Sequence, residues 1–330
     1  MTSLLVLSQR DVESLLDPHE LIGALATAME DLSAGRASVP NRVAASVEEH
    51  GGLLAAMPGY VPSLGALVAK LVTLFPGNAD GALPTHQALL GAFDPQTGEP
   101  LALMDATAIT ALRTAAGSAL SARLLARADA RVLAIVGTGV QARTHAEAVT
   151  LVREFGEVRV AGRSAGKAEA LARGLREHGL PARAARSIEE AVRGADVVCA
   201  ATHALEPVIR RGWLAAGVHV TSVGYHPEGR ELDDDTIADA LVVVESRATA
   251  LAPAPAGAND LTQPIRDGRI GPGHVHAEIG ELVAGTRPGR TSEDQITVYK
   301  SVGVAVQDAA AAALVLARAH GTGAGTRVEL

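Results

Sequence analysis

The chain has 330 residues, of which 48% are apolar and 2% aromatic, and its formal net charge at pH 7 is −8. A chain of this length is too long for one simple hydrophobic core, so we expect two domains. The negative charge and the scarcity of aromatic residues exclude a basic surface for nucleic acid. The single cysteine, Cys199, excludes a disulfide framework, and no apolar run is long enough to span a membrane. Since the first ten residues also lack a signal-peptide pattern, we expect a cytoplasmic protein.

The first third of the chain predicts two helices and then a sheet. Ser8 is a candidate N-cap of one helix, and a second amphipathic pattern over 18–34 stops at Gly35. Runs of strand-forming residues separated by Gly, Pro, Asn and Asp follow, at 42–47, 53–58, 67–74, 87–93 and 101–105. Residues 94–98 indicate a hairpin turn, which favours a mostly antiparallel sheet. A helix over 107–126 leads out of this region.

A glycine turn between a strand and a helix follows. The β-branched run 131–136 ends in Gly137 and Gly139 and passes into a helical pattern at 143–155. Gly137 permits a tight turn, Gly139 lets backbone N–H groups approach phosphates, and Ala142 allows close helix–strand packing. A second strand at 158–161 and a helix at 167–178 complete the βαβ context. We therefore expect a dinucleotide pyrophosphate at this turn, held by Gly137, Gly139, Val140, Gln141 and Ala142.

The end of the second strand indicates which dinucleotide is preferred. NAD sites place a carboxylate there, whereas NADP sites place a cation against the 2′-phosphate. Here the strand ends in Gly162, Arg163 and Ser164, with Lys167 one turn on and no carboxylate among them. The alternative is a solvated arginine after a strand. We interpret the pattern as a preference for NADPH, with NADH as the weaker cofactor.

The remainder of the chain continues the alternation. Strands are expected at 197–201, 218–223 and 241–244, an alanine-rich helix at 301–320, and a frayed glycine-rich tail at 321–330. Cys199, inside an apolar strand, is expected to be a small buried side chain rather than a nucleophile. The fold class is α/β. A doubly wound Rossmann domain (113–303) is joined to an N-terminal α+β sheet domain (1–112) that the C-terminal helix (304–330) completes.

Three cations in the sheet segment are candidates for gripping an anion. Strand alternation places Lys70 on the same face as Val68 and Val72, toward a core or a pocket. A bound carboxylate or a structural Asp or Glu would offset the cost of burying its ammonium group. Arg42 lies in a comparable strand, and Arg113 lies in the helix that enters the nucleotide domain. A small carboxylate substrate is one reading, and surface positions for the two arginines are the other.

Several segments together resemble the ornithine cyclodeaminase/mu-crystallin family across nearly the whole chain. They are KLVT at 70–73, PTHQ at 84–87, MDATAITALRTAA at 104–116, GTGVQA at 137–142 and ITVYKSVG at 296–303. The resemblance implies a homodimer formed through the sheet domain and a substrate between the two domains. By the same resemblance Arg42, Lys70 and Arg113 hold the substrate carboxylate. The residues implied at the dinucleotide are Arg113, Thr85, Thr114, Gln141, Ala142, Thr202, Val223 and Ser301.

One segment departs from that family. Ornithine cyclodeaminases carry an aspartate in a G-G-D-x-P-G-K segment, whereas residues 222–232 read SVGYHPEGREL and are one residue shorter. Whether Tyr225 or His226 takes the aspartate's place stays open. Without a carboxylate beside the substrate amine, deamination and cyclisation lose their positioned base. The chain therefore resembles more closely the mu-crystallin and ketimine reductase branch.

The chemistry that remains is reduction of an imine. Hydride from NADPH would reduce the C=N carbon of a 2-imino or cyclic ketimine carboxylate to an amino acid. Candidate proton donors are Lys70, His86 and His226, and a structural role for each histidine is the alternative. The spacing of His274 and His276 predicts no metal site, since no carboxylate or cysteine set completes one. The alternatives are an alanine dehydrogenase-like enzyme, an ornithine cyclodeaminase and a non-catalytic NADPH-dependent ligand-binding protein.

Overall fold

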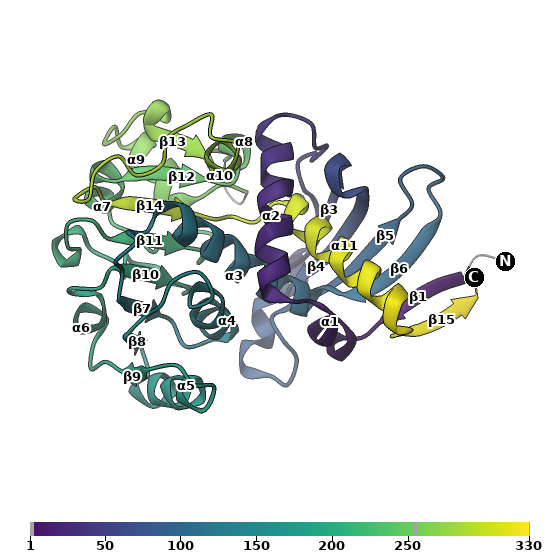
Figure 1. Cartoon of the computed structure of the whole chain (residues 1–330), viewed down its shortest axis with the longest axis horizontal. Coiled ribbons are helices and arrows are strands. Elements are labelled where there is room, and N and C mark those ends of the chain that lie inside the picture. The colour runs from purple at the N-terminus through teal and green to yellow at the C-terminus, as the bar shows by residue number, and fades with distance from the viewer. Residues whose placement is uncertain (1–2, 254–255, 330) are drawn as a thin grey trace. The chain divides into compact units, whose positions relative to one another are not determined.

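The computed structural model describes residues 3–253 and 256–329, except for the side chains of residues 79 and 80. It divides into two compact units (Figure 1): unit 1 is Met1–Arg113 with Val304–Leu330, and unit 2 is Thr114–Gly303. Each unit contains one sheet. The expected α/β class, a Rossmann-type domain and a separate sheet domain, is confirmed. The boundaries expected from the sequence lie within one residue of this division.

Unit 1 is built on a seven-stranded sheet in the order β15-β1-β6-β5-β4-β3-β2. Neighbours pair antiparallel except β1 and β6, so the expectation of a mostly antiparallel sheet is correct. Asp94 turns the chain between β5 and β6 by accepting from the N–H groups of Gln96 and Thr97 at 2.8 Å. The strands are β1 (Ser3–Leu7), β2 (Val43–Val47), β3 (Gly52–Val61), β4 (Ala66–Leu74), β5 (His86–Phe93), β6 (Pro100–Asp105) and β15 (Thr326–Glu329).

Helices cover one face of this sheet. Ser8 caps α1 and forms a capping box with Asp11, as the sequence predicts for a helix start. Helices α2 and α11 pack against each other, and α11 lies on β3 and β4 (Figure 1). A Cβ at Gly59 would lie 2.9 Å from the Cβ of Ala305, so only glycine allows this close approach. The helices of unit 1 are α1 (Gln9–Leu15), α2 (Pro18–Ser33), the first part of α3 (Ala106–Leu125) and α11 (Ala305–Thr322), with the short 3-10 helices η1 (Glu48–His50), η2 (Pro62–Leu64) and η3 (Pro76–Asp80).

The C-terminal segment differs from the expectation in two ways. The helix begins at Ala305 rather than at 301, because Glu245 accepts from the Ser301 hydroxyl at 2.6 Å and from the Val302 N–H at 2.7 Å. Those bonds hold the preceding residues in a non-helical path. The glycine-rich tail is not frayed where it is described, since β15 pairs with β1. Residue 330 lies outside the described residues.

Unit 2 contains an eight-stranded parallel sheet in the order β13-β12-β14-β11-β10-β7-β8-β9. The direction of winding reverses between β7 and β10, and ligands of open α/β sheets bind at such a switch point. The runs β7, β10 and β12 are almost wholly buried, as expected for strands covered on both faces. The strands are β7 (Val132–Val136), β8 (Glu157–Ala161), β9 (Ala182–Ala184), β10 (Val197–Ala200), β11 (His219–Ser222), β12 (Leu241–Val244), β13 (Val275–Glu278) and β14 (Thr297–Lys300).

The helices of unit 2 lie on both faces of its sheet (Figure 1). Helix α4 starts at Val140 and ends at Val149, so the helix expected over 143–155 is wrong at both ends. Gly139 is already its N-cap, and the Thr150 hydroxyl donates back to the carbonyl of Ala146 where the helix stops. None of the described helices is long and apolar enough to cross a membrane. The remaining helices are α5 (Ala165–Glu177), α6 (Ile188–Val192), α7 (Asp234–Asp239), α8 (Arg247–Ala250), α9 (Asn259–Arg266) and α10 (Ile279–Val283), with η4 (Arg211–Trp213) and η5 (Pro272–His274).

Two buried histidines tie the second half of α3 to the rest of unit 2. His145 lies 2.9 Å from the hydroxyl of Ser118, and His219 lies 3.1 Å from that of Ser121. Burial lowers the pKa of His145 to about 4 and that of His219 to about 3, the latter with help from the charge of Arg290. Both rings are therefore neutral at physiological pH and act as hydrogen-bonding parts of the core.

Candidate active site

Lys70 lies in the middle of β4 and is only 2% exposed. It faces the helix-covered side of the sheet, on the same face as Met57 and Leu90, its partners across β3 and β5. Its Nζ lies 2.8 Å from Oδ2 of Asp308, which is fully buried in the first turn of α11. The structural carboxylate that the sequence left open as a partner for Lys70 is therefore Asp308.

Arg113 joins the same cluster. Its Nε donates to Oδ1 of Asp308 at 3.2 Å, and its Nη1 donates to Oε1 of Gln307 at 2.6 Å. Gln307 is fully buried, and its Nε2 has no hydrogen-bond partner among the described residues. We call Lys70, Arg113, Gln307 and Asp308 the Lys70 cluster. It contains more N–H donors than acceptors, which favours an anionic ligand.

Charge and burial act on Lys70 in opposite directions. Burial, which disfavours the ammonium form, lowers the pKa of Lys70 to about 8, and the nearby charges of Arg113 and Arg42 lower it as well. The carboxylate of Asp308 acts the other way and raises it. Arg42, which is partly buried just before β2, is thus close enough to influence Lys70. The structure gathers the three predicted cations.

His86 lies apart from them. It is the first residue of β5, exposed, and its Nδ1 lies 3.1 Å from the hydroxyl of Thr85. Because His86 is paired with Leu74, it shares the sheet face of Lys70 but lies four residues along the strand. That separation is roughly 13 Å. His86 is therefore not an immediate cross-strand neighbour of Lys70.

The glycine turn of unit 2 has the geometry that a pyrophosphate requires. Gly137 has φ +127°, and a Cβ there would lie 2.4 Å from the carbonyl oxygen of Ala201. A Cβ at Gly139, by contrast, would meet nothing within 4 Å, so the N-terminus of α4 faces open space. Ala142 is fully buried behind the turn, and Oε1 of Gln141 is buried without a partner among the described residues. These residues fit a dinucleotide phosphate at a helix N-terminus.

The candidate adenosine side lies after β8. Arg163, Ser164 and Lys167 are all exposed there. The Ser164 hydroxyl caps α5 by accepting from the Lys167 N–H at 3.3 Å, so its own proton stays available to a phosphate oxygen. The guanidinium of Arg163 and the ammonium of Lys167 fit an additional phosphate at this end.

Other predicted cofactor residues lie at the carboxyl edge of the same sheet. Thr202 follows β10, Val223 follows β11 and Ser301 follows β14. Because these strands are parallel, their carboxyl ends lie along one edge. The hydroxyl of Thr202 donates to Oε1 of Glu231 at 2.8 Å. Thr114, the first residue of unit 2, lies nearly buried in α3.

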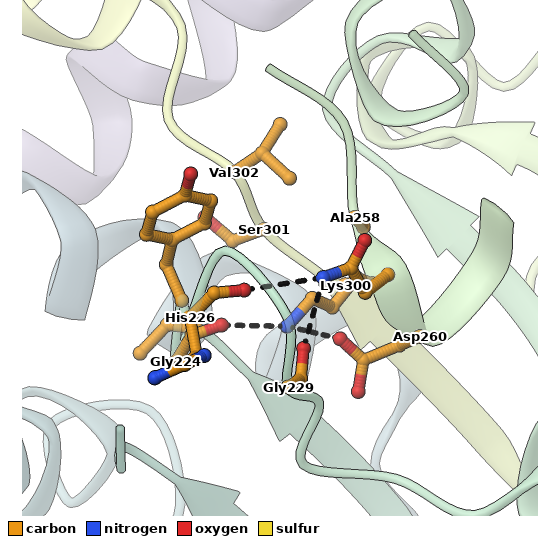
Figure 2. A pocket seen from close by; sticks show the side chains of 11 residues that line it. Gly224, His226, Gly229, Ala258, Asp260, Lys300, Ser301 and Val302 are labelled. Carbon is orange, nitrogen blue, oxygen red and sulfur yellow. Dashed lines mark hydrogen bonds and ion pairs between the residues drawn. The ribbon is translucent and has the colours of Figure 1, made fainter. Parts of the chain in front are cut away.

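A second buried lysine underlies this edge (Figure 2). Lys300 is 1% exposed, and its Nζ reaches three acceptors at 2.9 Å: the Ser222 hydroxyl, and Oδ2 of Asp260 and the Gly224 carbonyl, the two that Figure 2 draws. Glu231, 1% exposed, accepts from Ser222 and from the Gly224 N–H. We call Ser222, Gly224, Glu231, Asp260 and Lys300 the Lys300 cluster. Lys300 thus has one acceptor for each of its N–H groups.

The loop that departs from the family pattern rests on this cluster. Asn259 Nδ2 donates to the carbonyls of His226 and Gly229, two residues labelled in Figure 2, at 3.1 Å and to that of Pro227 at 2.9 Å. The ring of His226 accepts at Nδ1 from the Glu228 N–H at 3.1 Å, so its proton resides on Nε2. Tyr225 is 37% exposed. His226 and Tyr225 both line a small pocket with Lys300 and Ser301.

Sequence reasoning missed two buried carboxylates, Asp308 of the Lys70 cluster and Glu245, which accepts hydrogen bonds from residues 301–303. Gln307 and Asp308 interrupt an alanine-rich helix, and Glu245 directly follows the apolar strand β12. A charged residue within a buried apolar run requires a partner, and that is the signal that would have pointed to them. Cys199 is buried as expected, and burial raises the pKa of its thiol, so it is inert. His274 and His276 each lie close to a carbonyl oxygen, and no metal-binding group occurs among the described residues.

The similarity to known proteins extends over nearly the whole chain. The model of the ornithine cyclodeaminase/mu-crystallin family matches residues 3–323. The ketimine reductase mu-crystallin of Mus musculus is 39% identical over 277 residues, which are 84% of this chain and 83% of that protein. Delta(1)-pyrroline-2-carboxylate reductase of Thermococcus litoralis, solved with NADH and L-proline, has a TM-score of 0.94 and 38% identity, covering 98% of this chain and 100% of that one. An archaeal alanine dehydrogenase dimer with bound NAD has a TM-score of 0.93 and 34% identity, with each chain covered completely.

Proposed function

The chain belongs to the ornithine cyclodeaminase/mu-crystallin family, and we propose that it is an NADPH-dependent reductase of a small 2-imino or cyclic ketimine carboxylate. The product is the corresponding amino acid. The observation that carries the proposal is the Lys70 cluster, in which Lys70 and Arg113 are both almost fully buried around one carboxylate. A substrate carboxylate bound by Arg42, Lys70 and Arg113 satisfies these donors.

In this reaction the chain's residues hold the dinucleotide, orient the substrate and supply a proton. Bound at the carboxyl edge of unit 2, the nicotinamide dinucleotide supplies the hydride. Arg42 and Arg113 orient the substrate by its carboxylate, so that hydride reaches the C=N carbon while the π electrons pass to nitrogen. A proton then joins this nitrogen. Turnover consumes one imine, one reduced dinucleotide and one proton.

Lys70 is the donor that we assign to that proton. With its pKa lowered to about 8, its ammonium group is still the main form at pH 7 but releases a proton readily. His226 fits this task less well, because a protonated ring would have to give up the bond that its Nδ1 accepts from Glu228. His86 is exposed and lies along the strand from Lys70. We assign His226 a hydrogen-bonding role through Nε2 and His86 none in proton transfer.

The preference for NADPH rests on Arg163. Residues 162–167 contain no carboxylate to bind both ribose hydroxyls. One charge-assisted contact to the 2′-phosphate favours NADPH by roughly tenfold to a hundredfold. Arg163→Asp should reverse the preference, measured as the ratio of kcat/KM with NADPH and with NADH. Equal efficiency of the unmodified protein with both cofactors would contradict the assignment.

The activity is tested by steady-state oxidation of NADPH with pyrroline-2-carboxylate and a panel of acyclic and cyclic ketimine acids. Identification of the amino acid product separates reduction of a preformed imine from an alanine dehydrogenase-like reaction, which requires pyruvate and ammonia. The similarity to the alanine dehydrogenase makes that reaction the second candidate. Turnover with pyruvate and ammonia but with none of the ketimines would favour it. Binding of NADPH without turnover of any substrate would instead indicate a ligand-binding protein.

Ornithine provides a negative control. Neither Tyr225 nor His226 supplies the carboxylate that a cyclodeaminase places against the substrate amine. We therefore expect no useful release of ammonia and proline from ornithine. A rate on the order of 1 s⁻¹ or faster would show that another group has taken over that role.

We further propose that the protein is a homodimer formed through unit 1. Val43, Leu54, Leu71 and Leu89 share the sheet face opposite Lys70 and are between 42% and 67% exposed. An exposed apolar row of this kind is typical of an interface. Light scattering coupled to size-exclusion chromatography measures the mass, and Leu71→Lys should shift the protein toward the monomer. A monomeric unmodified protein would contradict the proposal.

A further inference from the structure

Asp308 is a carboxylate at a buried position, which is costly unless the charge is paired. It lies fully buried in the first turn of α11, next to Gln307. Oδ2 lies 2.8 Å from Lys70 Nζ and Oδ1 accepts from Arg113 Nε at 3.2 Å, so each oxygen meets a different cation. A carboxylate with both oxygens in use fixes the two cations relative to each other.

Gln307 completes this arrangement. Its Oε1 accepts from Arg113 Nη1 at 2.6 Å and from the Val304 N–H at 3.3 Å. Arg113 is therefore held at two of its three guanidinium nitrogens, Nε and Nη1, by two consecutive residues of α11. Because the N–H of Nε and one N–H of Nη1 are used within the chain, the remaining N–H groups of Arg113 are the ones that can meet a ligand.

The side chains that face Lys70 from the surrounding elements differ in charge. Met57 of β3 and Leu90 of β5 lie opposite it and carry no charge. Arg113 of α3 and Arg42 before β2 are both positive, and Asp308 of α11 is the negative group that acts on it. Two positive charges and burial thus favour the neutral amine, and Asp308 alone of these groups favours the ammonium ion.

We propose that Asp308 is a positioning residue for the reductase reaction: it keeps Lys70 in the ammonium form and aims it, together with Arg113, at the substrate. The inference rests on the proposed function, since it requires Lys70 to donate the proton. During turnover the ammonium of Lys70 gives its proton to the nitrogen formed by hydride addition. The resulting neutral amine of Lys70 then takes up from the solution the one proton that turnover consumes, and Asp308 stabilises the ammonium again.

The test is the pH dependence of kcat/KM for pyrroline-2-carboxylate at saturating NADPH, measured for the unmodified protein and Asp308→Asn. The unmodified protein should lose activity above a pH near 8, where Lys70 loses its proton. Removing the carboxylate lowers the pKa of Lys70. The decline in activity at high pH, which we call the alkaline limb, should therefore begin about one to three pH units lower. The imine nitrogen of the substrate titrates equally in both proteins, so the difference between them isolates Lys70.

Matched variants separate this role from a merely structural one. Asp31 is also a fully buried aspartate of unit 1, bonded to Arg36 and Ser63, and Asp31→Asn should lower thermal stability without moving the limb. In a Lys70→Arg background, Asp308→Asn should not shift any limb, because a guanidinium does not titrate in this range. A limb that shifts equally in the Asp31 variant, or in the Lys70→Arg background, would overturn the inference.

Asp308→Glu keeps the test valid if the asparagine variant does not fold. The longer side chain retains the charge but moves it, so the limb should stay near 8, while kcat falls roughly tenfold or more through lost alignment. An unchanged kcat in this variant, or an unchanged limb in a folded Asp308→Asn protein, would contradict the inference. Absence of ketimine reduction by the unmodified protein would instead contradict the proposed function, so the two failures are distinct.

Discussion

Lys70 in unit 1 and Lys300 in unit 2 are both almost fully buried on strands, yet their surroundings differ. Lys300 has an acceptor for each of its N–H groups, one of them the carboxylate of Asp260. Lys70 pairs with a carboxylate that it shares with Arg113, and Arg42 adds a further positive charge. Burial alone therefore does not define a functional lysine. The balance of charge around each ammonium group distinguishes them.

That difference assigns them separate tasks. The Lys300 cluster is internally satisfied, and it fixes the loop from Gly224 to Glu231 at the carboxyl edge of the sheet. The Lys70 cluster has donors to spare, so it is suited to bind and protonate a ligand. Substitution of each lysine should consequently affect a different property of the protein.

The largest effect is expected from Lys70. Lys70→Arg keeps the positive charge but cannot donate a proton, so kcat should fall by roughly 10²–10⁴-fold. Lys70→Met should lose the activity at least as severely, since it also removes a contact to the substrate carboxylate. Steady-state kinetics with a ketimine substrate measure both. A methionine variant with near-normal kcat and KM would remove Lys70 from the mechanism.

Lys300→Met should act on stability instead. It leaves Oδ2 of Asp260 and the Gly224 carbonyl without the Lys300 ammonium group, and breaking a buried pair of this kind costs about 3–5 kcal/mol. Lys70→Met is the matched control, because Asp308 retains Arg113 as a partner. Denaturant unfolding followed by circular dichroism gives both free energies of unfolding. Equal losses in the two variants would contradict the distinction between the clusters.

Substitution of Arg113 should affect substrate binding by the Lys70 cluster and leave proton transfer largely intact. Arg113→Ala removes charge-assisted contacts to the substrate carboxylate, so KM for the ketimine should rise roughly tenfold to a hundredfold. The value of kcat should change much less than in Lys70→Arg. A variant in which kcat falls and KM is unaltered would place Arg113 in the chemical step.

The smallest effect concerns pH, and it separates stability from catalysis. His145 and His219 have folded pKa values of about 4 and about 3 and an ordinary value of 6.5, so the unfolded chain binds more protons below 6.5. The free energy of unfolding should therefore decline as pH falls from 6.5, by about 1–2 kcal/mol for each histidine near pH 5. Replacing both with glutamine should flatten this slope. A free energy of unfolding that stays constant between pH 6.5 and 5 would contradict the assignment.

The sequence predicted the regular parts of the fold well. Strands such as β12 and helices with explicit caps, such as α1 at Ser8, are encoded by neighbours along the chain. The strands β1, β9, β13, β14 and β15 were not anticipated. A short strand such as β15 forms through its pairing with β1 at the far end of the sequence, so no local pattern announces it.

The candidate site shows the same limit. Lys70 stood out because a charge in an apolar strand is costly, and the glycine turn at Gly137 stood out through its spacing. The partners of Lys70 could not be read in the same way. Asp308 is far from Lys70 along the chain, and only the packing of α11 on β4 brings their charges together.

The order of segments in unit 1 has a consequence for biosynthesis. Unit 2 is one continuous stretch, whereas unit 1 is interrupted by it and completed by α11 and β15. A ribosome therefore finishes all of unit 2 before it makes the helix that carries Asp308. At ordinary elongation rates that interval lasts roughly 10–40 s. During this interval the nascent chain contains Lys70 but not its counter-ion Asp308. A chain truncated before α11 would therefore contain unit 2 but would lack the pair of Lys70 and Asp308.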